Sequence, residues 1–314
     1  MQISHIKAFE VLAASSATGL LTSLTGTGGS SILTPILTLV IGISPKIAIP
    51  SDIVGSISMR ATTSSVSLRS GRFEKRIVLT IVAGQLIGLS ISTLLLTGFH
   101  PSDASLSTAL GIALSVVGIG LAIKESMSRT SKRRYPIGMR LVALLIGGAI
   151  SAIAVTYTSV GGGVITYLVL AFSYPDLDAP TLIGVDVTAS LTLCTIASIE
   201  TIATGRGEAS LMALIAIGGL LGCIVGERVK KKVPSRPLKK LIAVVIGAVG
   251  LFYLAKRGLV VLAVILALSL IALTTIARRI PIGNDEEEAD MVLGNSKNQL
   301  PKSHFTKDQL KVRP

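Results

Sequence analysis

The chain has 314 residues, of which 50% are hydrophobic and 15% are charged, and its formal net charge is +13. This composition excludes a single soluble domain, because the apolar residues come in blocks long enough for bilayer-spanning helices of about 20 residues. We therefore predict an all-α polytopic membrane protein. The apolar blocks lie near 6–25, 30–43, 47–68, 77–98, 105–123, 138–158, 162–174, 180–203, 209–226, 239–255 and 258–277.

The basic residues are concentrated between these blocks. Of the 30 Lys and Arg residues, 24 fall in four groups, at 69–76, 124–140, 228–240 and from 278 onward. The positive-inside rule places such groups in the cytoplasm. It predicts a multi-pass plasma-membrane protein whose basic loops and C-terminal tail are cytoplasmic. Nucleic-acid binding is excluded, because no basic run lies on a folded aqueous domain with interleaved aromatic residues.

Glycine-rich stretches interrupt two of the apolar blocks. Residues 24–31 read L-T-G-T-G-G-S-S, and residues 158–165 read T-S-V-G-G-G-V-I. Each glycine lowers helix stability by about 1 kcal/mol relative to alanine. In a membrane protein such a break is tolerated where the freed backbone groups are buried in protein or line a cavity. Matching breaks in two halves indicate a transporter's binding site.

Other residues recur at nearly the same spacing. At an offset of 134, Asp52 matches Asp186 and Ser56 matches Ser190. Further matches join Gly71-Arg72 to Gly205-Arg206, Glu74 to Glu208, Gly84 to Gly218 and Gly88 to Gly222. We infer an internal duplication. The predicted parts are a first membrane repeat at 1–124, a basic cytoplasmic linker at 125–137, a second repeat at 138–255, an extra transmembrane helix at 256–279 and a disordered cytoplasmic tail at 280–314.

Each predicted repeat contains five apolar blocks, and the second block is short. As a helix, residues 30–43 span about 21 Å, against a hydrocarbon core of about 30 Å. If all five blocks cross the membrane, the second repeat is inverted relative to the first, although Lys7 and the pair Lys256-Arg257 fit this arrangement poorly. In the alternative topology the short blocks are re-entrant and the repeats are parallel.

The glycine breaks are candidate anion sites. A glycine run before a helix exposes backbone N–H groups at the positive end of the helix dipole. The candidate binding residues are Gly26, Gly28, Gly29, Ser30 and Ser31 before 32–43, and Gly161, Gly162 and Gly163 before 165–172. Two such ends facing each other predict a pocket for a small anion. Close helix packing through small residues is the alternative.

Four charged residues lie inside apolar blocks, where a charge costs roughly 2.5–3.5 kcal/mol on insertion scales. They are Asp52, Arg60, Asp186 and Glu200. Arg60, which has Cys194 at the equivalent position, is expected to bind an anion or to neutralise Asp52. Asp52 and Asp186 are candidates for proton coupling or for anchoring the broken helices, with N-capping as the alternative for Asp52. Glu200 lies near a helix end, where it can reach the interface.

These motifs resemble the sulfite-exporter (TauE/SafE) family of membrane transporters. The resemblance rests on G-x-G-G followed by an apolar run with Pro35, on residues 48–52 (A-I-P-S-D), and on their repetition at 161–163 and 179–188. It covers the chain up to about residue 255 and implies export of sulfite or related organosulfonates. Ser30, where family members often have a third glycine, and Leu168, the counterpart of Pro35, depart from the pattern and bear on the substrate.

We therefore predict a secondary transporter that exports small sulfur-containing anions by alternating access around the two glycine breaks. Two alternatives remain: a cation- or amine-coupled carrier that uses the intramembrane acids, and a membrane-embedded accessory subunit whose basic linker and tail dock a partner. The expected partners are a small anion and the lipid bilayer, and a second copy of the chain is left open. The sequence contains no metal-ligand spacing and no hydrolase or nucleotide-binding motif, so we expect no metal, no cofactor and no enzymatic activity.

Overall fold

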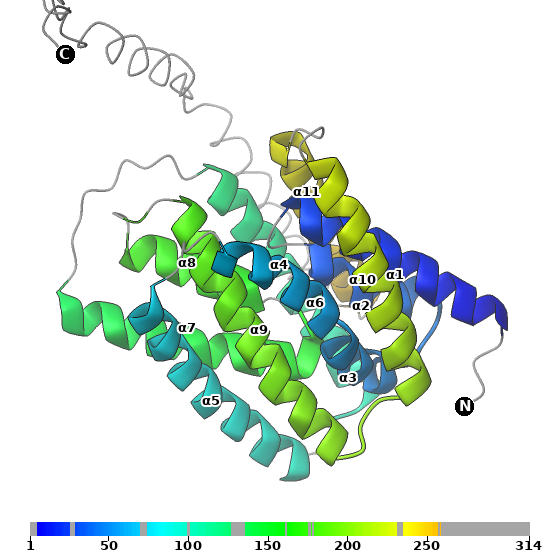
Figure 1. Cartoon of the computed structure of the whole chain (residues 1–314). Helices are drawn as coiled ribbons and strands as arrows, with labels where there is room; N and C mark the ends of the chain where they lie inside the picture. The colour runs from blue at the N-terminus through cyan, green and yellow to red at the C-terminus, as the bar shows by residue number, and fades with distance from the viewer. Residues whose placement is uncertain are drawn as a thin grey trace, which may run out of the picture. The chain divides into compact units, whose positions relative to one another are not determined.

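The structure is a computed structural model of the chain. It describes residues 5–25, 29–69, 74–98, 101–126, 136–160, 162–174, 177, 179–230, 235–256 and 258. All regular elements in these ranges are helical, which confirms the predicted all-α class (Figure 1). All of the predicted helix at 256–279 except residues 256 and 258, the tail and most of the basic linker lie outside the described residues.

The first half follows the predicted blocks, with two differences. Its long helices are α1 (His5–Thr25), α5 (Lys75–Gly98) and α6 (Asp103–Ser126). The second block is an irregular segment instead of one helix, made of the 3-10 turn η1 (Gly29–Ile32), the short α2 (Leu33–Pro35) and the π-helical η2 (Ile36–Val40). The third block is divided at Ser56 into α3 (Pro45–Gly55) and α4 (Ile57–Arg69).

In the second half the corresponding blocks are regular helices. They are α7 (Ile137–Thr158), α8 (Gly162–Ser173), α9 (Ala179–Ala203), α10 (Ala209–Val229) and α11 (Ser235–Lys256). The short second block is here the single helix α8, and the third block is the continuous helix α9. Proline explains part of this contrast, because the ring removes a backbone donor: Pro35 ends α2 and Pro50 lies inside α3, whereas Leu168 continues α8.

Five helices among the described residues are long and apolar enough to cross a membrane: α5, α6, α7, α9 and α10. Large apolar side chains are exposed on them, including those of Leu79, Leu94, Ile150 and Ile202. In a bilayer these side chains face lipid instead of water. The largest buried cluster lies inside and joins residues of α3, α6, α7, α9 and α11, such as Leu114, Leu193 and Ile246.

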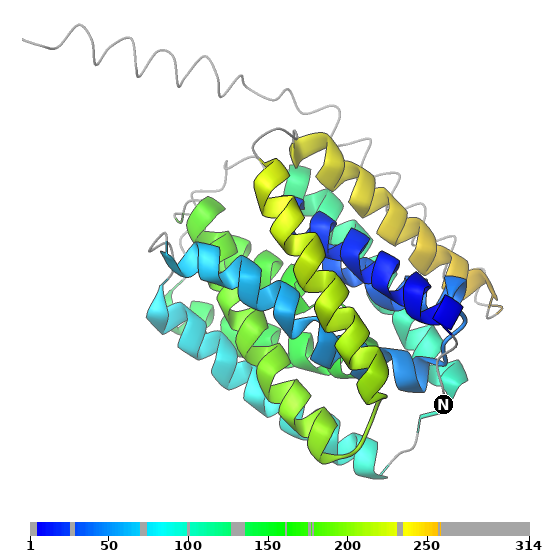
Figure 2. The ribbon, with the colours of Figure 1, turned by 45° about the vertical axis from the view of Figure 1, so that its right-hand side comes forward.

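Glycines bring helices of the two halves together. α5 packs against α7, and α1 packs against α10, as the blue and yellow-green helices of Figure 2 show. A Cβ atom on Gly88 would lie 2.2 Å from the carbonyl oxygen of Ala149, and one on Gly222 would lie 1.9 Å from that of Ser16. Gly88 matches Gly222, and Ala149 follows Ser16 by 133 residues. The two helix pairs therefore meet at matching positions.

The pairing of α6 with α11 gives the relative direction of the last helices of each half. A Cβ atom on Gly118 would lie 2.6 Å from Cα of Gly247, and one on Gly111 would lie 3.1 Å from Cγ of Leu254. Residue numbers rise along α6 as they fall along α11, so the two helices are antiparallel. Inverted repeats predict this arrangement, whereas parallel repeats predict the opposite one. The duplication remains a prediction, with which these pairings agree.

Candidate functional site

Asp52 forms a buried polar centre where the two halves meet. It lies in α3 and is 1% exposed. Its Oδ2 atom accepts a hydrogen bond from the Thr34 hydroxyl of α2 and another, of 2.9 Å, from the Ser159 hydroxyl after α7. Because α3 begins at Pro45, Asp52 does not cap that helix, and the N-cap alternative is wrong.

The end of α7 positions the Ser159 hydroxyl. Ser159 caps α7 in a left-handed backbone conformation, with φ of 56°, and its N–H group donates to the carbonyl oxygen of Val155. This conformation costs a residue with a Cβ roughly 1–2 kcal/mol. It ends the helix two residues before the glycine run and turns the buried Ser159 side chain to Asp52.

Two polar stripes extend from this centre. Asp52, Ser56 and Arg60 recur every four residues along α3 and α4, and Asp186, Ser190 and Cys194 do so along α9. Residues four apart share one face of a helix. α4 packs against α9, and the Ser198 hydroxyl of α9 donates 3.3 Å to the carbonyl oxygen of Ile53. The matched serines are buried in both stripes.

Arg60 is the member of the α3–α4 stripe that reaches the α9 stripe. Its half-buried side chain is near enough to interact electrostatically with Asp52, and it also contacts the Cys194 thiol of α9. A guanidinium is a permanent cation with planar donors that match the geometry of an oxyanion. Both predicted roles, neutralising Asp52 and binding an anion, are therefore compatible with its position.

The second glycine break lies beside the matching acid. Gly162 begins α8, and a Cβ atom on Gly163 would lie 3.3 Å from Oδ2 of Asp186 and 3.4 Å from Oγ of Ser190. The first N–H groups of a helix lack intrahelical partners and favour negative charge. The Asp186 carboxylate thus lies beside the first turn of α8, where an anion is favoured. A transported anion at this helix end would have to displace or neutralise Asp186.

The first break differs from the prediction. Gly26 and Gly28 lie outside the described residues, as does Gly161 in the second break. Gly29 and Ser30 begin η1, and Ser31 is buried in it. Because an irregular segment follows instead of the expected helix at 32–43, the predicted dipole of a regular helix is absent here. The segment is held by Thr34, which bonds Asp52, and by Thr38, which bonds Tyr253 of α11.

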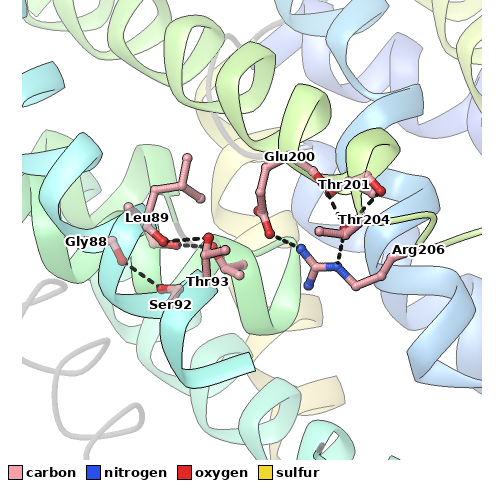
Figure 3. A network of polar contacts seen from close by, with 10 residues as sticks. Gly88, Leu89, Ser92, Thr93, Glu200, Thr201, Thr204 and Arg206 are labelled. Carbon is pink, nitrogen blue, oxygen red and sulfur yellow. Dashed lines mark hydrogen bonds and ion pairs between the residues drawn. The ribbon is translucent and has the colours of Figure 1, made fainter. Parts of the chain in front are cut away.

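Glu200 does not join the Asp52 centre. It lies near the end of α9 and forms an ion pair with Arg206 in the loop before α10 (Figure 3).

The sequence analysis did not assign three residues that make polar contacts with the predicted acids: Thr34, Ser159 and Arg206. The repeated Gly-Arg pair, and the place of Ser159 directly before the break, are the signals that could have identified two of them. Among the described residues no group of three or more His, Cys, Asp or Glu side chains could hold a metal ion.

Residues 11–253 match the model of the family described as sulfite exporter TauE/SafE. The chain belongs to the sulfite exporter TauE/SafE family. This TauE/SafE chain is also 25% identical, over 241 residues, to the "Probable membrane transporter protein YjnA" of Bacillus subtilis (strain 168). That alignment covers 74% of the chain and 94% of the relative. No solved structure matches with statistical significance. The TauE/SafE chain is therefore a multi-pass protein of a membrane transporter family.

Proposed function

We propose that this TauE/SafE protein exports small sulfur-containing oxyanions, such as sulfite or organosulfonates, by secondary transport. The family supports the transporter class and the name of the substrate. The observation that supports an anion is Arg60, a cation that interacts with Asp52 of its own half and with Cys194 of the other. A small oxyanion can take both hydrogen bonds of a guanidinium fork.

The transport step we propose is a movement of the two halves against each other. The polar stripes that contain Asp52 and Asp186 belong to different halves, and the Ser159 bond to Asp52 also crosses between them. Breaking and remaking such contacts would open the site to each side in turn. Protonation of either carboxylate removes a negative charge near the anion, so we propose that the anion crosses together with a proton and that a pH gradient changes its flux.

We propose an inverted arrangement of the two repeats in the plasma membrane. The Ser44 hydroxyl donates 2.9 Å to Asp103, so α3 and α6 begin on the same side of the membrane. This side has few basic residues, and the positive-inside rule makes it the outer side. With α6 and α11 antiparallel, the loop from α9 to α10 lies on the outer side, and the basic linker before α7 lies in the cytoplasm.

Binding of the substrate can be measured as thermal stabilisation of the purified protein in detergent. The panel contains sulfite, thiosulfate, sulfoacetate, taurine, sulfate, chloride and several amines. A ligand at 100 times its dissociation constant adds about 2.7 kcal/mol to the free energy of unfolding. We expect stabilisation by sulfur oxyanions, its loss in Arg60→Gln, and its retention in Lys46→Gln, which removes an exposed cation from α3.

The same panel tests the amine-carrier alternative. One observation favours that alternative: within the described part of the chain, the buried Oδ1 atom of Asp52 accepts no hydrogen bond. Such an oxygen could receive an ammonium group. Stabilisation by amines that is absent with sulfite and lost in Asp52→Asn would replace the anion proposal with this one.

A further inference from the structure

The loop between α9 and α10 holds a second arginine in a fixed position. The backbone N–H of Arg206 donates 3.1 Å to the carbonyl oxygen of Thr201. Its Nε atom donates 2.9 Å to the Thr204 hydroxyl, and its guanidinium pairs with Glu200, as the dashed lines of Figure 3 show. The Arg206 and Glu200 side chains are 30% and 16% exposed, so the pair remains open to solvent.

This loop rests on the turn of α3 that carries Asp52. The backbone N–H of Glu208 donates 3.0 Å to the Ser51 hydroxyl. Gly207 has φ of 84°, and a Cβ atom on it would lie 2.9 Å from Oγ of Ser51. Ser51 is buried and directly precedes Asp52. Left-handed backbone and close approach together require glycine at 207.

A longer-range interaction also links Arg206 to the same centre. Tyr157 of α7 interacts electrostatically with Arg206. Two residues later, Ser159 donates its hydrogen bond to Asp52. The loop that carries Arg206 therefore contacts α3, and Arg206 is near enough to the end of α7 to interact electrostatically with Tyr157.

We propose that Arg206 is an outer binding residue for small oxyanions, which it takes in exchange for Glu200. The inference rests on the proposed function, because it adds a second anion-binding site on the outer side of the anion pathway. A guanidinium fork accepts an oxyanion in the same bidentate way as a carboxylate. Because the pair is partly exposed, an arriving anion can reach the guanidinium and replace Glu200. Thr204 then keeps the guanidinium in place through its Nε atom.

The surrounding charge favours this role. Six basic residues of the sequence lie outside the four basic groups, and Arg206 is one of them. Between Arg60 and Arg228, every other Lys or Arg belongs to the group at 69–76 or the group at 124–140. Glu208 and Glu200 are the acids next to Arg206 in the chain. An anion that approaches the loop from 204 to 208 thus meets the Arg206 guanidinium, whose attraction is reduced by Glu200. Removing Glu200 should strengthen binding, and removing Arg206 should weaken it.

The test is the KM for external sulfite during exchange with internal sulfite, in right-side-out vesicles that contain the full chain. We expect Glu200→Gln to lower this KM about three- to tenfold and Arg206→Gln to raise it by a similar factor. The matched control is Glu227→Gln. It removes a carboxylate that pairs with Lys230 at the other end of α10, and it should leave the KM unchanged.

The direction of the two shifts separates binding from a structural role. An ion pair that only stabilises the loop would give both variants the same defect, in stability and in maximal rate. Because Arg206→Gln can misfold, Thr204→Val is a second test of the same site. This variant removes the hydrogen-bond acceptor of Arg206 Nε and keeps both charges. It should raise the KM for sulfite about two- to threefold. Unchanged KM values, or shifts in one direction, overturn this inference alone. Wild-type vesicles that exchange no sulfur oxyanion across the membrane overturn the inference and the proposed function together.

Discussion

The Ser159 hydroxyl donates a 2.9 Å hydrogen bond to Asp52, a residue that lies 107 positions earlier in the chain. This bond joins α3 of the first half to the end of α7 in the second half. It also holds Ser159 in a left-handed conformation at the point where the second glycine break begins. The acid of one half and the break of the other are therefore parts of one buried centre.

Replacing Ser159 separates the hydrogen bond from the backbone strain. Ser159→Ala removes a donor from buried Asp52, which should lower the free energy of unfolding by about 1–3 kcal/mol. Ser159→Gly removes the same donor but relieves the left-handed backbone, so its loss should be smaller by about 1 kcal/mol. Thermal unfolding in detergent measures both. The control is Ser151→Ala, because the Ser151 hydroxyl donates within α7, to the carbonyl oxygen of Gly148. Equal losses in Ser159→Ala and Ser159→Gly would contradict the assigned strain.

The glycine contacts between the halves predict equal effects at matched positions. In Gly88→Ala and Gly222→Ala the new methyl would lie within about 2.2 Å of a carbonyl oxygen of the neighbouring helix. Each should therefore lower the free energy of unfolding by about 1–3 kcal/mol, as overpacking does. Gly138→Ala is the control, because a Cβ atom there has no neighbour within 4 Å. This variant should be neutral or more stable by up to about 1 kcal/mol. A loss in one half alone would argue against equivalent packing.

Replacing the carboxylate of Asp52 or of Asp186 should uncouple sulfite transport from the proton gradient. Asn keeps an oxygen that accepts a hydrogen bond but cannot take up a proton reversibly. We expect Asp52→Asn and Asp186→Asn vesicles to exchange sulfite across the membrane without accumulating it when a pH gradient is imposed. Accumulation by the wild-type protein is the reference. If both variants accumulate sulfite at the wild-type rate and with the wild-type pH dependence, neither acid couples transport to protons.

Cysteine labelling tests the inverted arrangement. The two native cysteines, Cys194 and Cys223, are buried and should give little background. We expect Ala104→Cys and Ser210→Cys to react with a membrane-impermeant maleimide on intact cells, and Gly138→Cys to react only after permeabilisation; all three positions are exposed. Parallel repeats would instead place Ser210 in the cytoplasm. Ser210→Cys therefore decides between the two topologies.

Much of the fold could be predicted because hydrophobic blocks and their breaks are local properties of a membrane sequence. The long helices α5, α7 and α9 begin and end within two residues of the predicted blocks. The irregular segment that replaces the helix at 32–43 was missed. Glycine and proline show that a helix is disfavoured there, but the 3-10 and π-helical turns depend on what packs around it. Thr34 and Thr38 are tied to α3 and α11, which lie far along the chain.

The candidate site could be predicted in its residues but not in its connections. The sequence showed the spacing of Asp52, Ser56 and Arg60 and its repetition in Asp186 and Ser190. The hydrogen-bond partner of Asp52 could not be predicted from the sequence, since Ser159 meets Asp52 only when the end of α7 packs against α3. The same holds for Glu200, whose partner Arg206 is brought back by the turn after α9. Long-range pairs of this kind depend on the packing of whole helices.

The most direct test of the account is sulfite flux in proteoliposomes that contain only the purified chain. We predict that the wild-type protein moves radiolabelled sulfite down its gradient, that unlabelled organosulfonates compete with it, and that Arg60→Gln abolishes the flux while Lys46→Gln retains it. Sulfite movement no faster than in protein-free liposomes, or full flux in Arg60→Gln, would contradict an anion transporter centred on Arg60.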